Sequence, residues 1–271
     1  MSAGRSPWRL GLALALVLAL GAACGDDDEG GSAQSQGSTD TSAAAPGPTG
    51  NLTVLAAASL TESFTELGRM FEAGHPGTKI TFNFDSSSAL ATQANNDVPA
   101  DLFASADQAN MKKVTDAGNA ADPKVFAHNR LAIVVAKGNP KKIAGLADLA
   151  RPGVTFVLCA PEVPCGKYAA EAMKKADVKG TPKSLETNVK GVVTKVTTGQ
   201  VDAGIGYATD ARAVGASAEG VDIPDEQNVI ADYPVAVLEQ APNPALARAF
   251  LDYILGADAQ GVLARYGFSG L

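Results

Sequence analysis

The sequence is poor in the residues that build metal centres and disulfide scaffolds. Its 271 residues include three cysteines and two histidines, which are too few for a disulfide framework or a multi-histidine metal site. The net charge is −7, whereas a nucleic-acid-binding protein normally presents a basic surface, so the charge argues against a nucleic-acid partner. Apolar residues still make up 46% of the chain, which is enough for a folded core and excludes disorder throughout.

A long apolar run is also missing. The most apolar stretch, residues 10–23, has fourteen residues, carries no charge and is mostly Leu, Ala, Val and Gly. This is too short to cross a bilayer as a helix, but it suits the apolar region of a signal peptide. Because Arg5 and Arg9 supply positive charge before it, residues 1–23 are predicted to be an export signal.

Residues 20–25 read Leu-Gly-Ala-Ala-Cys-Gly, and the small residues before Cys24 resemble the bacterial lipobox. In that motif, cleavage leaves the cysteine N-terminal and diacylated. Ordinary cleavage near an incidental cysteine is the alternative, and Gly21 departs from the usual leucine at its position. Residues 24–50 hold five acidic residues, no Lys or Arg and no large apolar residue, so we expect a disordered acidic tether. The remaining residues, 51–271, carry a net charge of only −4.

Residues 51–271 alternate between short apolar segments and segments with helical spacing. We expect strands at residues 53–58, 79–85, 101–105, 131–136, 155–160, 204–208 and 233–238. We expect helices to begin at Ser59, within the serine run 86–88, at Asp107, near residues 166 and 187, and at Asn243. Ser59 and Glu62 have the spacing of a capping box. The alternation predicts an α/β fold with mostly parallel sheets flanked by helices.

Ligands of α/β sheets sit beyond the carboxyl ends of strands, where helices begin. Three such junctions, residues 56–60, 86–88 and 164–166, contain small residues and no Lys or Arg. They offer free backbone N–H groups at positive helix ends, and two of them add hydroxyls. Neutral donors can surround a fully ionised oxyanion, whereas a monoprotonated phosphate also needs an acceptor. Each junction taken singly is equally explained by helix capping.

Seven segments, read in order, resemble the periplasmic molybdate-binding proteins of ABC importers. They are AAASLT (56–61), SSSALATQ (86–93), PADLFASAD (99–107), PEVPCG (161–166), GIGY (204–207), YPVAV (233–237) and RYGF (265–268). The ordered set covers nearly all of residues 51–271.

The resemblance implies a two-lobed type II periplasmic-binding-protein fold that closes around its ligand. Each lobe is then a mostly parallel sheet flanked by helices. Lobe I would comprise residues 51–128 and 232–271, and lobe II residues 129–231. The two crossovers would lie near residues 127–130 and 231–233.

The resemblance also implies a ligand shell without direct metal ligands. The expected oxyanion-binding residues are Ser59, Ser87, Cys165, Val189 and Tyr207. Both serines would supply hydroxyl and backbone N–H donors, Cys165 and Val189 backbone N–H groups, and Tyr207 its hydroxyl. The protein would need no cofactor and would take molybdate or tungstate as its ligand. It would act as a monomer that is anchored to the outer face of the cell membrane through lipidated Cys24. From there it would deliver the ligand to an ABC permease.

Two positions depart from the family pattern. Cys165 stands where well-known members often have alanine, which is tolerable if only its backbone donates. Asp85 precedes the serine run, where a small residue is common. Because a carboxylate repels a nearby anion, either Asp85 points away or the site tolerates a protonated ligand.

Cys159 and Cys165 have five residues between them and share the oxidising location that an export signal implies. We expect a disulfide between them, which would preorganise the loop that presents the Cys165 N–H group. A pair of free thiols is one alternative. A metal pair is another, although His75 and His128 lie elsewhere in the sequence.

Two other functions compete with this interpretation. A binding protein for sulfate or another oxyanion belongs to the same class, and an exported serine hydrolase belongs to a different one. The sequence contains no Gly-x-Ser-x-Gly motif of a nucleophile elbow. Neither His75 nor His128 is placed as an evident base, so we expect a binding protein and not an enzyme.

Overall fold

The computed structural model describes residues 47–270. The predicted export signal, the Cys24 lipidation site and nearly all of the predicted tether lie outside these residues. Within them, no helix is long and apolar enough to span a membrane.

The described residues form nine strands and eight α-helices. The strands are β1 (Gly50–Ala57), β2 (Thr78–Asp85), β3 (Leu102–Ala104), β4 (Lys124–Ala136), β5 (Phe156–Cys159), β6 (Leu185–Glu186), β7 (Ala203–Tyr207), β8 (Ala218–Asp222) and β9 (Ile230–Val237). The helices are α1 (Thr61–Gly74), α2 (Ser87–Asn95), α3 (Gln108–Asp116), α4 (Pro164–Lys175), α5 (Val189–Thr197), α6 (Ala208–Ala213), α7 (Pro244–Leu255) and α8 (Ala257–Tyr266). All seven predicted strands are present, whereas β6, β8, α6 and α8 are not among the elements that the sequence predicts.

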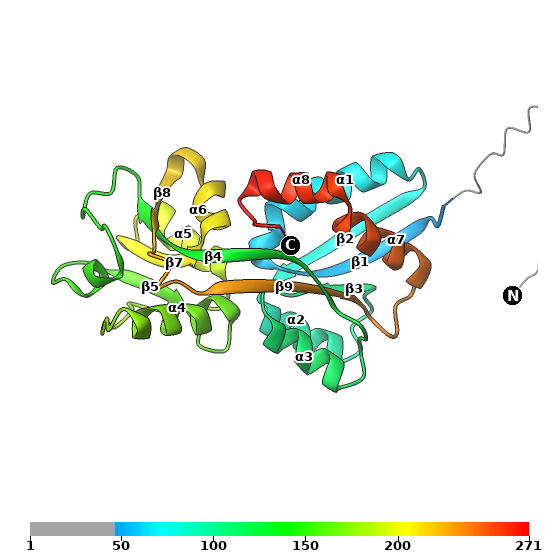
Figure 1. Ribbon diagram of the computed structural model, residues 1–271, viewed down its shortest axis with the longest axis horizontal. Helices are drawn as coiled ribbons and strands as arrows, with labels where there is room; N and C mark the ends of the chain where they lie inside the picture. The colour runs from blue at the N-terminus through cyan, green and yellow to red at the C-terminus, as the bar shows by residue number, and fades with distance from the viewer. Residues whose placement is uncertain (1–46, 271) are drawn as a thin grey trace, which may run out of the picture. The chain divides into compact units, whose positions relative to one another are not determined.

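The strands follow the order β2-β1-β3-β9-β4-β7-β5-β6, with β8 paired to β4. The first part of β4, residues 124–130, pairs with β9, and its second part, residues 131–136, pairs with β7 and β8. Figure 1 shows β4 and β9 side by side between two groups of elements. One group contains β1, β2 and β3 with α1, α2, α3, α7 and α8. The other contains β5, β7 and β8 with α4, α5 and α6.

The prediction of mostly parallel sheets is wrong, because the pairing is mixed. β1 is parallel to β2 and β3, and β5 is parallel to β6 and β7. However, β9 is antiparallel to β3 and β4, and β4 is antiparallel to β7 and β8. β4 carries the chain from the first group to the second and β9 returns it in the opposite direction, so these two strands are antiparallel.

The segments predicted as crossovers, residues 127–130 and 231–233, lie in paired strands. His128 lies opposite Asp232, and Asn129 lies opposite Ala231, in the β4–β9 pair. The sequence predicts a strand only from Leu131 because polar residues interrupt the apolar pattern before it. Those polar side chains have partners in the fold: His128 Nδ1 lies 2.8 Å from Asp232 Oδ1, and Asn129 Nδ2 donates to Thr209 Oγ1 at 2.9 Å. Their pairing removes the desolvation penalty that would otherwise oppose a strand here.

Apolar spacing correctly predicted the buried face of the first helix. Phe64, Leu67 and Phe71 of α1 are fully buried. The Phe64 ring lies 6.1 Å from that of Phe82 on β2, and the Phe71 ring lies 5.1 Å from that of Phe250 on α7. Burial of such rings supplies much of the folding free energy, at about 25 cal/mol per Å² of apolar surface.

Most helix starts follow the predicted capping chemistry, with one exception. The Asp107 carboxylate accepts from the Asn110 N–H group at 2.9 Å, and Asn243 caps α7 with Pro244 as its first residue. Ser59 does not cap α1. It lies in a 3₁₀ turn (Ala58–Leu60) between β1 and α1, and α1 has no side-chain cap. The predicted capping box is wrong because the Ser59 hydroxyl bonds to Tyr233 instead.

Candidate functional site

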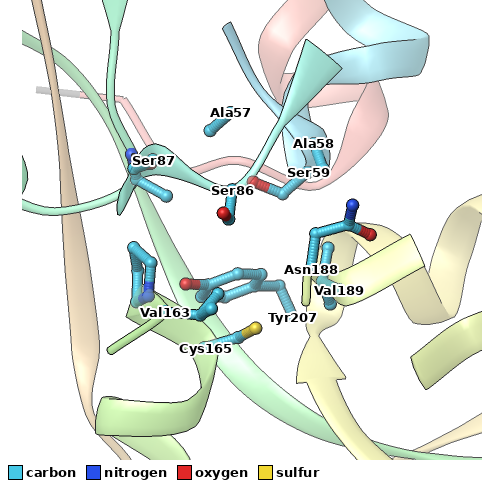
Figure 2. Close-up of a pocket in the computed structure, with 12 residues that line it drawn as sticks. Ala57, Ala58, Ser59, Ser86, Ser87, Val163, Cys165, Asn188, Val189 and Tyr207 are labelled. Atoms are coloured by element: carbon cyan, nitrogen blue, oxygen red, sulfur yellow. Dashed lines mark hydrogen bonds between the residues drawn. The ribbon is translucent and has the colours of Figure 1, made fainter. Parts of the chain in front are cut away.

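A narrow cavity lies where the two groups of elements meet. It is lined by Ala57, Ala58, Ser59, Ser86, Ser87, Ala106, Val163, Pro164, Cys165, Asn188, Val189 and Tyr207. All five residues that the resemblance implies as ligands are in this lining, and Figure 2 shows them around one space. The cavity volume is about 10 Å³, close to what a single water molecule requires. The walls therefore lie close together around this space.

Four chain segments bring helix starts to this cavity. Ser59 lies in the 3₁₀ turn after β1, Ser87 is the first residue of α2, Cys165 the second of α4, and Val189 the first of α5. Backbone N–H groups in a first helical turn have no acceptor within their own helix. The positive ends of the helix dipoles add to these donors. The lining is therefore rich in neutral hydrogen-bond donors.

Two serine hydroxyls in the lining already accept hydrogen bonds. Ser87 Oγ accepts from the Ala106 N–H group at 2.8 Å. Ser86 Oγ accepts from the Ala89 N–H group at 3.3 Å, as an N-cap does. Because a hydroxyl has a single proton to donate, these contacts leave both protons available to the cavity. The site residues inferred from the sequence omit Ser86, although the triple serine is itself the signal that could have indicated it.

The Tyr207 hydroxyl has no hydrogen-bond partner among the described residues, although its side chain is 1% exposed. In Figure 2 it points into the space between Ser86 and Val163. Leaving such a group unsatisfied costs about 1–3 kcal/mol, so the fold tolerates a penalty at this position. Burial raises the pKa of Tyr207 well above its usual value, so the hydroxyl keeps its proton and remains a donor.

Two glycines allow the helix starts to approach the strands closely. A Cβ atom at Gly204 on β7 would lie 2.4 Å from Val192 Cγ1 of α5. A Cβ atom at Gly166 would lie 2.1 Å from the Ala160 carbonyl oxygen. Both distances are below contact, so the absence of a side chain lets α5 and α4 bring Val189 and Cys165 to the cavity.

Cys159 at the end of β5 and Cys165 in the first turn of α4 form a disulfide, with their Cα atoms 5.8 Å apart. The bond closes the loop that carries the start of α4. The alternatives of free thiols and a metal pair therefore do not describe this structure. Across residues 47–270, no three His, Cys, Asp or Glu side chains are grouped as metal ligands.

Charged groups surround the cavity without lining it. Lys190, next to Val189, bonds to Glu62 of α1 at 2.8 Å and to Asp210 of α6 at 3.1 Å. Burial works to lower the pKa of Lys190, but the charges of Asp210 and Glu62 outweigh it and raise that pKa.

The Asp85 carboxylate accepts from Ser86 N–H at 2.7 Å and from Asn188 Nδ2 at 3.0 Å. Asp85 itself is not part of the lining, although both of its donors belong to residues that are.

The lining does not contain the pair of serine nucleophile and general base that a serine hydrolase needs. The Ser59 hydroxyl lies 2.8 Å from the Tyr233 hydroxyl, which is not a general base at neutral pH. His75 stacks on Phe71 and His128 pairs with Asp232, and neither lines the cavity. The serine is therefore placed to donate a hydrogen bond and not to lose its proton to a base.

Comparison with known proteins identifies similar chains. A family model described as "Bacterial extracellular solute-binding protein" matches residues 52–269. The chain is 43% identical to the Molybdate-binding protein ModA of Mycobacterium tuberculosis (strain ATCC 25618 / H37Rv) over 227 residues, which cover 82% of this chain and 87% of that protein. It is 34% identical to the Molybdate-binding protein ModA of Escherichia coli (strain K12), over 81% of this chain and 89% of that protein.

A solved structure shares the fold. The sulfate-binding protein SubI from Mycobacterium tuberculosis H37Rv matches with a TM-score of 0.75 and 22% identity, over 82% of this chain and 87% of that one. The mixed α/β architecture of the described residues is therefore one that a known binding protein also has.

Proposed function

The chain belongs to the bacterial extracellular solute-binding protein family, and from this premise we propose that its donor-lined cavity captures molybdate for an ABC importer. Tungstate, which has nearly the same size and charge, would enter the same site. The family, the names of the two relatives given above and the chemistry of the lining support this proposal. The lining offers hydrogen-bond donors, and the described residues contain no metal-binding cluster.

The observation that carries this proposal is the Tyr207 hydroxyl, which has no hydrogen-bond partner within residues 47–270. A buried donor among four helix starts is complementary to a fully ionised oxyanion, which accepts hydrogen bonds at every oxygen. In a dry site each such bond is stronger than in water. The anion would thus compensate the cost of leaving the hydroxyl unsatisfied.

Five residues would form the ligand shell in this proposal. Ser59 and Ser87 supply hydroxyl and backbone N–H donors, Cys165 and Val189 supply N–H groups, and Tyr207 supplies its hydroxyl. All five line the same cavity, and four lie at or near helix starts. No Lys or Arg is in this lining, so recognition would rest on neutral hydrogen-bond donors and on the size of the cavity.

Binding would close two lobes about the β4–β9 pair. We assign lobe I to residues 51–128 and 232–271 and lobe II to residues 129–231. Two antiparallel strands connect the lobes, and such connections bend by small changes in several backbone angles. Because the cavity draws on both groups of elements, opening at these strands would admit the anion.

The proposal also places the protein on the outer face of the cell membrane. Export would remove residues 1–23, and a lipid on Cys24 would hold the monomer by the acidic tether of residues 24–50. A tether lets the folded part reach the permease while it remains close to the membrane.

Calorimetric titration of the purified protein tests this function. We expect heat and an increase in thermal stability with molybdate and tungstate, and little response to phosphate at neutral pH. A response to sulfate without one to molybdate would instead favour a sulfate-binding protein. Turnover of an ester substrate that is lost in Ser59→Ala would favour the hydrolase.

A further inference from the structure

Behind Ser59 lies a tyrosine that does not line the cavity. Tyr233 of β9 is 0% exposed, and its hydroxyl oxygen lies 2.8 Å from Ser59 Oγ. Tyr233 is absent from the cavity lining. Its contact with the site is therefore made through the Ser59 hydroxyl.

The direction of this hydrogen bond follows from Asn129 on the neighbouring strand. Asn129 Oδ1 accepts from the Arg130 N–H group at 3.0 Å, which fixes the orientation of the amide. Its Nδ2 atom then faces the Tyr233 hydroxyl at 3.3 Å and donates to it. The Tyr233 oxygen is an acceptor in this contact, so its own proton must find another partner.

Ser59 Oγ is the partner that remains for the Tyr233 proton among the described residues. If Ser59 donated to Tyr233 instead, the phenolic proton would be buried without an acceptor, at a cost of about 1–3 kcal/mol. The favoured arrangement therefore runs from Asn129 to Tyr233 and from Tyr233 to Ser59. Burial raises the pKa of Tyr233, so this proton is retained at neutral pH.

We propose that Tyr233, oriented by Asn129, is a positioning residue that makes Ser59 a donor toward the ligand and thereby excludes oxyanions that carry a proton. The proposal rests on the anion-binding function proposed above. An oxygen that accepts from Tyr233 directs its own proton into the cavity. The same logic holds for Ser87 and Ser86, whose oxygens accept from Ala106 and Ala89 N–H groups.

Removing the Tyr233 hydroxyl frees the Ser59 oxygen to turn and accept. In Tyr233→Phe, the Ser59 proton is no longer directed at the anion, so we expect molybdate affinity to fall about tenfold, the size of one net hydrogen bond. A monoprotonated phosphate would now find an acceptor for its hydroxyl. We expect its affinity relative to molybdate to rise about threefold or more.

A double-mutant cycle tests whether Tyr233 acts through Ser59. The full-length protein and its Tyr233→Phe, Ser59→Ala and doubly substituted variants are titrated with molybdate and with inorganic phosphate. We expect Tyr233→Phe to cost about tenfold in the wild-type background and nothing further in Ser59→Ala, because the two residues act as a unit. Equal losses in both backgrounds would overturn the proposal.

Two further variants complete the experiment, one as a control and one as a substitute for Tyr233→Phe. Tyr253→Phe removes a buried tyrosine hydroxyl that has no partner in the described part of the chain and that lies away from the cavity lining. This variant should leave both affinities unchanged. If Tyr233→Phe does not fold, Asn129→Ala takes its place in the cycle, with a smaller loss that must also vanish in Ser59→Ala. A wild-type protein that binds sulfate and not molybdate would refute the proposed ligand, and the cycle would then be run with sulfate.

Discussion

Lys190 of α5 and Glu62 of α1 form an ion pair across the candidate site, with Lys190 Nζ 2.8 Å from Glu62 Oε2. The two residues come from different groups of elements, which within residues 47–270 are joined through strand pairing by β4 and β9. Lys190 also pairs with the buried Asp210 within its own group. Opening the cavity would therefore break the bond to Glu62 and keep the bond to Asp210.

We expect Glu62→Gln to weaken ligand binding by about two- to fivefold, the effect of a partly exposed ion pair. The substitution removes a contact present only when the groups are close, so the closed form loses stability relative to the open form. Titration at low and high salt measures this, and the difference should shrink as salt screens the pair. Asp116→Asn breaks the exposed Lys112–Asp116 pair and serves as a control without effect on affinity.

Tyr207→Phe should weaken molybdate binding by about ten- to a hundredfold, as expected for a lost hydrogen bond to a charged group. The protein without ligand should be equally stable or more stable, because the hydroxyl has no partner among residues 47–270. Titration and thermal unfolding without ligand measure the two effects. A loss of stability equal to the loss of binding would mean that the hydroxyl supports the fold and not the ligand.

The affinity for molybdate should stay constant from neutral pH to about pH 9. Ionisation of Tyr207 would remove a donor and place a negative charge beside the anion, so it would weaken binding as the pH rises. Because burial raises the pKa of this hydroxyl well above 10.0, that ionisation lies beyond this range. Titration at several pH values checks this expectation, and a fall in affinity centred near pH 8 would contradict it.

Reduction of the Cys159–Cys165 disulfide should lower the free energy of unfolding by about 2 kcal/mol, the value for a short closed loop. Affinity should also fall, because the loop that presents Cys165 must then be ordered on binding. Urea unfolding with and without reductant measures the first effect. Cys159→Ser combined with Cys165→Ser should reproduce both effects, whereas modification of both cysteines in the unreduced protein by a thiol reagent would contradict the disulfide.

Gly204→Ala should destabilise the protein by about 1–3 kcal/mol, as overpacking does. The added methyl group would meet Val192 at 2.4 Å and push α5 away from β7. Because Val189 begins α5, affinity should fall as well. Gly199→Ala is the control. A Cβ atom at this position meets nothing, but φ is positive, so the substitution should lower stability through backbone strain without lowering affinity.

Local patterns in the sequence predicted most of the elements. The spacing of Phe64, Leu67 and Phe71 predicted α1, and Asp107 and Asn243 marked the starts of α3 and α7. These predictions succeed because apolar spacing and capping depend on residues within one or two turns. The Ser59 capping box failed because Tyr233, 174 positions away, provides the partner of that serine.

The sequence by itself determined the α/β class and most of the helix starts, with their small residues and hydroxyls. Through the resemblance it also predicted the five residues of the candidate shell. Only the tertiary structure decided that β4 and β9 cross between the groups as paired strands. It alone left the Tyr207 hydroxyl without a partner among the residues that the structure describes, placed Lys190 against Glu62 and set Tyr233 behind Ser59. The reason is physical: propensity and capping act over a few residues, whereas burial and hydrogen-bond partnership depend on segments that meet only when the chain has folded.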